Sequence, residues 1–160
     1  MLLKNVEEFL AILRRSKVRY CIIGGVAILL HGGRASTIDF DLYVLVAGTD
    51  ALRKALSQTG ASLVISGPEQ IRVKFKGLSI DVLIADALLG AGAVERAQLK
   101  SLGGMRVRVA SPEDLIIMKT LADRPIDRRD VEELREIFAG KLDVRFISTQ
   151  LRKIRKILAD

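Results

Sequence analysis

The sequence predicts an α/β protein, with a small mixed sheet, flanking helices and a helical carboxy-terminal segment. A short β-branched run at 20–23 leads through a double glycine into a helical stretch, and further strand-like runs follow. Helical periodicity dominates the last third of the chain. At 160 residues with 49% hydrophobic side chains, the chain suits one core. We expect one domain over 1–160, with a sheet-containing core at 1–110 and a helical segment at 111–160.

The first half of the chain predicts strands separated by clear turn signals. Strands are expected at 20–23, 38–46, 62–65, 71–75 and 78–84, with another at 105–109. In the run at 38–46, Ile38, Phe40, Leu42 and Val44 alternate with polar positions, which predicts one buried face. The breaks at Gly67-Pro68 and Lys76-Gly77 predict that the three strands between 62 and 84 are sequential and antiparallel.

Helices are predicted by apolar spacing and by capping residues. They are expected at 6–15, 26–31, 49–56, 111–122, 127–138 and 143–158. Asn5 and Glu8 have the spacing of a capping box for the first helix, and Ser111-Pro112 is a strong start for the fourth. The segment 87–99 is weakly helical and contains two glycines, so its structure stays open.

Composition restricts the class of protein. The formal net charge of +7 favours polyanionic partners such as nucleotides or nucleic acid, whereas only 4% aromatic residues argue against a surface that stacks several bases. The single Cys21 falls in an apolar run, which predicts a buried, inert thiol and no intrachain disulfide. The apolar stretch 21–30 is far shorter than the roughly 20 residues of a membrane helix, and no signal peptide is evident. We expect a soluble, cytoplasmic protein without membrane contact.

Three aspartates form the main candidate site. Asp39 and Asp41 are two residues apart in a predicted strand and therefore share a face. Asp81 interrupts another apolar strand, and all three carboxylates converge if the two strands are neighbours. Such like charges require a counterion, and oxygen ligands suit hard divalent cations, with Mg²⁺ or Mn²⁺ fitting best.

The glycine turn before the second helix completes the pattern. Gly24 and Gly25 permit close backbone approach, and the helix that follows offers N–H groups to phosphate oxygens. Two metal ions held by carboxylates can activate an attacking oxygen and stabilise a leaving one. Together these features predict a triphosphate-binding catalytic site.

This combination resembles the polymerase-beta-type nucleotidyltransferase superfamily, which has a double glycine, a spacer of about a dozen residues, Asp-x-Asp and a later strand Asp. The segment HGGRASTIDFDLYV is similar to the corresponding segment in a small prokaryotic branch of this superfamily, akin to the abortive-infection and toxin–antitoxin nucleotidyltransferases. That branch carries an Arg and a Thr before its Asp pair, here Arg34 and Thr37. The resemblance implies a nucleotidyltransferase fold.

A second stretch, SPEDLIIMKTLADRPIDRRDVEEL, resembles the helical region of the same branch through Lys119, Arg124, Asp127 and Asp130. Two departures are Gly25, where most of the superfamily has Ser, and Ile126, where close relatives often have a basic residue.

The resemblance implies roles for individual residues and a reaction. Asp39, Asp41 and Asp81 would be catalytic metal ligands, and Gly24, Gly25, Arg34 and Lys119 would bind nucleotide. The reaction would be Mg²⁺-dependent transfer of a nucleoside monophosphate from an NTP to an acceptor, either RNA or tRNA, protein or a small molecule, with release of pyrophosphate.

Plainer interpretations remain open for several residues. Arg34 could simply neutralise the acids, Lys119 could be a surface lysine, and His31 is expected to be structural. Asp127 and Asp130 suit the start of a helix. Alternative functions are a catalytically silent nucleotide- or partner-binding module, such as one half of a toxin–antitoxin pair with its cognate partner, and an RNA-binding domain that uses the basic helix at 151–158.

Overall fold

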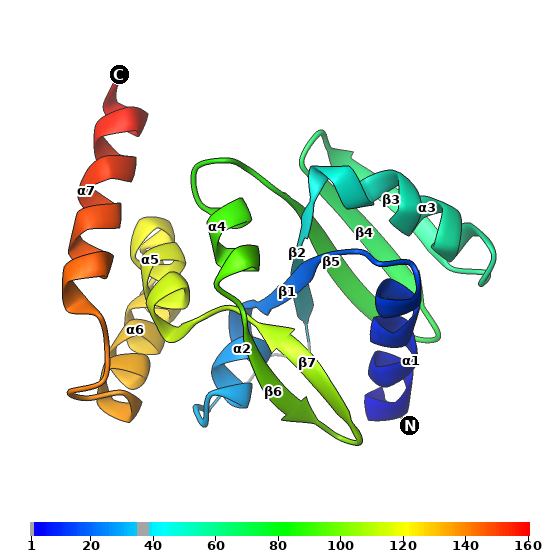
Figure 1. The fold of residues 1–160 in the computed structure, drawn as a ribbon, viewed down its shortest axis with the longest axis horizontal. Coiled ribbons are helices and arrows are strands. Elements are labelled where there is room, and N and C mark those ends of the chain that lie inside the picture. Colours follow the sequence, from blue (N-terminus) through cyan, green and yellow to red (C-terminus); the bar gives the residue numbers. More distant parts are fainter. Residues whose placement is uncertain (1, 35–38) are drawn as a thin grey trace.

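The computed structural model describes residues 2–34 and 39–160, which form a mixed sheet with helices packed around it (Figure 1). The strands are β1 (Tyr20–Ile23), β2 (Phe40–Leu45), β3 (Ser62–Gly67), β4 (Gln70–Phe75), β5 (Leu78–Ala85), β6 (Gln98–Leu102) and β7 (Met105–Val109). The helices are α1 (Leu2–Arg15), α2 (Gly24–Leu30), α3 (Thr49–Ser57), α4 (Gly90–Glu95), α5 (Pro112–Ala122), α6 (Pro125–Ile137) and α7 (Val144–Ala159), with a 3₁₀ turn η1 (Val46–Gly48). The predicted α/β class is confirmed.

Within the described residues the sheet has seven strands in the order β3-β4-β5-β2-β1-β7-β6. The strands β3, β4 and β5 are sequential and antiparallel, as the turn signals predict. The pairs β2–β5 and β1–β7 are parallel, whereas β1–β2 and β6–β7 are antiparallel. The sheet is therefore mixed, and β2 lies near its centre beside β5.

The alternation predicted for β2 is present. Phe40, Leu42 and Val44 are buried against the core, while Asp41 and Tyr43 lie on the opposite face. Residue 38 lies outside the described residues. The expected end of this strand is wrong, because Val46 begins η1, and Thr49 Oγ1 donates a hydrogen bond to the Val46 carbonyl.

The predicted start of α1 is also wrong. The helix begins at Leu2, so Asn5 lies inside it and caps nothing. Its side-chain amide instead donates to the carbonyl of Lys76 in the β4–β5 turn, at 2.8 Å. The residues before Asn5, two leucines and a lysine, are good helix formers and extend the helix by one turn.

Residues 87–99 contain the largest departure from the expected elements. Only 90–95 are helical, and Gln98 starts the strand β6, which pairs with β7. Most of β6 is exposed and Leu99 is 53% exposed, so the sequence lacks the alternation that reveals a half-buried strand. Likewise α6 begins at Pro125 rather than Asp127, because proline fits the first helical turn.

The helices α5, α6 and α7 follow the sheet and lie together at one side of it (Figure 1). The helix α5 contacts both others, and α7 buries Ile147, Leu151 and Ile154. In the part of the chain that is described, no helix is long and apolar enough to cross a membrane. Cys21 is fully buried with a free thiol, and burial raises its pKa to about 12, as expected for an inert cysteine.

Candidate active site

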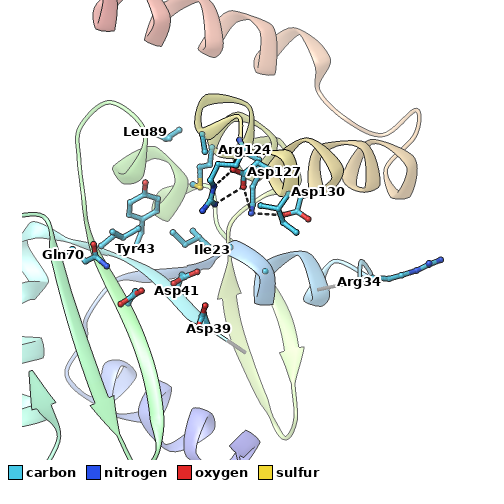
Figure 2. Close-up of a pocket in the computed structure, with 18 residues that line it drawn as sticks. Ile23, Arg34, Asp39, Asp41, Tyr43, Gln70, Leu89, Arg124, Asp127 and Asp130 are labelled. Atoms are coloured by element: carbon cyan, nitrogen blue, oxygen red, sulfur yellow. Dashed lines mark hydrogen bonds and ion pairs between the residues drawn. The ribbon is translucent and has the colours of Figure 1, made fainter. Parts of the chain in front are cut away.

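The carboxylates meet because of strand register. In the parallel pair β2–β5, Asp41 stands directly opposite Asp81, and in the pair β1–β2 it stands opposite Ile23. Directly paired residues share a face of the sheet, so both aspartates project to the same side. Asp39 immediately precedes β2 and lies at the same end (Figure 2). The expected neighbourhood of the two aspartate strands is confirmed.

Gly24 supplies close backbone contact with this cluster. Its φ is +69°, a left-handed conformation that L side chains rarely adopt. A Cβ at this position would lie 2.5 Å from Asp41 Oδ2. Gly24 and Gly25 both line the cavity, so the turn from β1 into α2 brings bare backbone against the carboxylates. Glycine is required here for conformation and for space.

Asp41 is the electrostatic centre of the cluster. Burial raises its pKa to about 6, and the negative charges of Asp81 and Asp39 act in the same direction. Lys119 and then Arg124 partly oppose this shift. A half-buried carboxylate with an elevated pKa beside two further acids lacks sufficient positive compensation. Such a group gains strongly from a nearby cation.

Asp81 is held differently. Arg72 lies directly opposite it in the antiparallel pair β4–β5, with Nε 2.7 Å from Oδ1 and Nη2 3.2 Å from Oδ2. The hydrogen bond from Arg72 lowers the Asp81 pKa, and Gln70 contributes further. In this arrangement, no group of three His, Cys, Asp or Glu side chains among the described residues has metal-binding geometry. Asp39 and Asp41 are thus adjacent to a third carboxylate that is already paired.

Lys119 faces the site from α5 and is bound by two acids. Its Nζ lies 3.0 Å from Asp127 Oδ1 and 2.7 Å from Asp130 Oδ2, with the lysine side chain only 13% exposed. Burial lowers its pKa, but the hydrogen bonds to Asp130 and Asp127 outweigh that effect and the net shift is upward. Lys119 is therefore a held, charged group, not a loose surface lysine.

Asp127 stabilises the first turn of α6 by accepting hydrogen bonds from the residue that caps it. Its side chain is fully buried and accepts from the backbone N–H and the guanidinium of Arg124 as well as from Lys119. The Arg124 hydrogen bond is the main reason that its pKa falls to about 2. The expectation of a helix-start role for Asp127 is confirmed. Through Arg124 it also fixes a cation that lines the cavity (Figure 2).

The site residues line a solvent-accessible cavity of about 490 Å³. Asp39 and Asp41 line one part of it and Arg124 lines another (Figure 2), and Asp81, the glycine turn and Lys119 also contribute to its lining. The remaining wall is formed mainly by apolar or aromatic side chains, namely Tyr43, Leu83, Leu89, Met118 and Ala122. The cavity can thus accommodate a cation–polyanion pair together with an organic group.

Arg34, a nucleotide-binding candidate from the sequence, is placed less centrally. Arg34 lies at the rim of the cavity, and its side chain extends away from the aspartates (Figure 2). Its backbone N–H donates to Glu133 Oε1 at 2.8 Å. Thr37, the other member of that motif, lies outside the described residues. The structure therefore does not bring the Arg34 guanidinium to the Asp pair.

His31 is buried in the packing between α2 and its neighbours. Its Nε2 is 2.8 Å from the Ala110 carbonyl, and its ring packs edge-on against Phe138. Burial lowers its pKa, which favours the neutral ring. The expected structural role is confirmed.

Arg72 and Arg124 were absent from the site residues expected from the sequence. The signal for Arg72 was present, because a two-residue turn at Lys76-Gly77 pairs Phe75 with Leu78, and the same register pairs Arg72 with Asp81. The motif at 111–134 contains Arg124 but does not predict its role, because the direction of the Arg124 side chain depends on how α6 packs.

Comparison with solved structures confirms the fold. The antibiotic-resistance factor ANT(2'')-Ia matches with a TM-score of 0.71 and 18% identity, over 98% of this chain and 92% of that one. The lincosamide antibiotic adenylyltransferase LnuA, solved with lincomycin, matches with a TM-score of 0.63 and 19% identity, over 84% and 96%. A nucleotidyltransferase-like protein of Paracoccidioides brasiliensis also scores 0.63 at 19% identity, over 99% and 90%. At these identities the similarity establishes the nucleotidyltransferase fold alone.

Sequence comparison gives the family. No curated protein is significantly similar to the chain. A family model described as a nucleotidyltransferase of unknown function (DUF6036) matches residues 1–159. With the glycine turn, the paired aspartates and the fold in agreement, the chain belongs to this DUF6036 family of nucleotidyltransferases.

Proposed function

We propose that this protein transfers a nucleoside monophosphate from an NTP to an acceptor and releases pyrophosphate, with Mg²⁺ or Mn²⁺ as cofactor. The observation that carries the proposal is the direct pairing of Asp41 with Asp81 across β2 and β5, with Asp39 beside them. In this proposal Asp39 and Asp41 hold the ions. Asp81 ligates one of them and assists deprotonation of the acceptor.

The donor set supports a hard divalent cation. All three side chains offer carboxylate oxygens, which Mg²⁺ and Mn²⁺ prefer. The pKa of Asp41 is elevated because the carboxylate is buried beside two like charges. A bound cation would offset this unfavourable environment of the charged form. When bound, such ions neutralise charge that develops on the attacking and leaving oxygens.

The triphosphate is assigned to the glycine turn and the cationic wall. Backbone at Gly24 and Gly25 approaches the carboxylates without an intervening side chain, which leaves room for phosphate oxygens. Lys119 and Arg124 face the same cavity and remain charged. Arg34 joins them only if its side chain turns inward from the rim.

The structural neighbours suggest which acceptors to test first. One crystal structure of ANT(2'')-Ia contains adenylyl-2''-tobramycin, and that of LnuA contains lincomycin. Both are organic small molecules, and the cavity has a wall at Tyr43 and Leu89, apart from the carboxylates, against which an organic acceptor could lie. RNA and proteins are the other acceptor classes to be tested. Membership of the toxin–antitoxin branch, with a cognate partner, also stays a prediction from the motifs.

The test is transfer of label from each of the four α-labelled NTPs in the presence of Mg²⁺ and cell extract. Separation of the products into small-molecule, RNA and protein fractions identifies the acceptor class. The variant Asp39→Ala with Asp41→Ala is expected to lose transfer by at least a thousandfold. Asp50→Ala, an exposed carboxylate in the first turn of α3, is the matched control and is expected to retain it.

Label that persists in the double variant contradicts the assigned site. Mg²⁺-dependent NTP binding without transfer to any fraction would instead support the silent binding module. Affinity for RNA that falls with salt and ignores Mg²⁺ would support the RNA-binding alternative.

A further inference from the structure

Arg72 and Asp81 form an ion pair that is built into the sheet. Their strands are antiparallel neighbours, and the two residues stand directly opposite each other in the register. Asp81 is in turn directly opposite Asp41. A single row across the site face therefore runs from the guanidinium of Arg72 through Asp81 to Asp41. The guanidinium of Arg72 lies at the outer end of this row, and the two carboxylates follow it inward.

Arg72 occupies both oxygens of Asp81. Nε binds Oδ1 at 2.7 Å, and Nη2 binds Oδ2 at 3.2 Å. A divalent ion that approaches Asp81 from the Asp41 side meets a carboxylate whose charge is already compensated. It also meets the positive charge of the guanidinium a few ångströms behind. The pair therefore weakens Asp81 as a metal ligand as long as it is closed.

The pair is also easy to open. The side chain of Arg72 is 47% exposed and that of Asp81 is 25% exposed. On the outer side, Arg72 stands opposite Val64, which is 52% exposed and offers it no polar partner. Exposed pairs of this kind contribute little to stability, unlike the Lys119–Asp127 pair, whose carboxylate is fully buried.

We propose that Arg72 competes with the divalent ion for Asp81, so that the third carboxylate joins the metal site only when this guanidinium is displaced. This inference rests on the proposed function and adds a regulatory element to the same site. Arg72 is a positioning residue in this scheme. It sets how much divalent cation is needed before Asp81 takes part, whereas Gln70, a neutral hydrogen-bond partner of Asp81, adds no competing charge.

The sharpest test is metal affinity measured without turnover. Mn²⁺ binding to the full-length protein is followed by the electron paramagnetic resonance signal of free Mn²⁺, with and without a non-hydrolysable NTP analogue. Arg72→Gln is expected to tighten Mn²⁺ binding about two- to fivefold, the range that corresponds to an exposed ion pair. In the Asp81→Asn background, the same substitution is expected to have no effect.

Lys74→Gln is the matched control. Lys74 is also exposed and lies two residues further along β4, opposite Ser79 rather than an acid. The Lys74→Gln substitution removes one positive charge from the same strand and is expected to change Mn²⁺ affinity less than Arg72→Gln does. Unfolding temperatures show whether each variant is folded.

The outcomes separate this inference from the proposed function. Unchanged or weaker Mn²⁺ binding in Arg72→Gln overturns the competition, even if the wild-type protein binds Mn²⁺ and transfers nucleotide. Equal tightening in Lys74→Gln overturns it as well, because the effect is then one of general charge. Mn²⁺ binding that appears only in Arg72→Gln supports the competition, whereas binding absent from every variant contradicts both proposals.

Discussion

Gly24 and Asp41 are in such close contact that a Cβ on the glycine would lie 2.5 Å from the carboxylate oxygen Oδ2. Gly24 is the first residue of α2 and directly follows β1, whereas Asp41 lies within β2, the strand that pairs with β1. The position of the carboxylate therefore depends on the absence of a side chain at residue 24. This dependence can be tested separately from the conformational requirement for glycine.

Gly24→Ala is expected to displace the Asp41 carboxylate and to lower transfer or metal affinity at least tenfold. Gly32→Ala is the control, because Gly32 also has a positive φ, +96°, yet its Cβ would meet nothing within 4 Å. Both variants should lose about 1 to 2 kcal/mol of stability from the left-handed conformation. Denaturant unfolding and Mn²⁺ binding distinguish them. Equal functional loss in both would show that the contact with Asp41 is unimportant.

Asp41→Asn is expected to stabilise the metal-free protein at pH 7.5 while abolishing transfer. The folded-state pKa of Asp41 is raised from 3.8 to about 6, so stability is lost as the pH rises from 3.8 to about 6 and the full cost of the charge is present above that pH. Removal of the charge should add on the order of 2 kcal/mol to the free energy of unfolding in EDTA. As the pH falls below about 4, Asp41 becomes protonated in both the folded and the unfolded state, and the difference in stability between wild type and variant should vanish. Lower stability of the variant at pH 7.5 contradicts the electrostatic account.

Metal affinity is expected to fall in acid. A proton with a pKa of about 6 competes with the cation for Asp41. Mn²⁺ binding should therefore weaken about tenfold between pH 7.5 and pH 5, as titration by calorimetry can measure. An affinity that stays constant over this range would place the metal ligands elsewhere.

Asp127→Asn is expected to cost about 3 kcal/mol in the free energy of unfolding at pH 7, because it removes a fully buried partner from Lys119 while Asp130 remains. The folded-state pKa of Asp127 is lowered to about 2, so its contribution is present above pH 4 and is lost as the pH falls toward 2. The gap between wild type and variant should close over that interval. Asp123→Asn, which breaks the exposed pair with Arg128, should change stability little.

The sequence was sufficient where local pattern and burial coincide. Alternation in β2 fixed which face carries Asp41, and the turn at Lys76-Gly77 fixed the direction of β4 and β5. It failed at β6, where an exposed edge strand has no apolar alternation, and at the start of α1, where Asn5 binds the Lys76 carbonyl. These outcomes depend on tertiary neighbours that no local window contains.

Prediction of the site was limited for the same reason. The proximity of Asp81 to Asp41 followed once the two strands were assumed to be neighbours, and the structure places them in direct register. The sequence does not predict the ion pairs of Asp81 with Arg72 and of Lys119 with Asp127, because they depend on side-chain direction across strands and between helices. The roles of all these residues in transfer stay predictions.

The parallel pairing of β2 with β5 has a consequence for biosynthesis. Asp41 and Asp81 are separated by the whole β3–β4 hairpin, and Lys119 follows only after two more strands. A chain emerging from the ribosome exposes Asp39 and Asp41 long before Asp81 and Lys119 have been synthesised. Fragments that stop before β5 should therefore show no divalent-ion response, and the site should form only when the centre of the sheet closes.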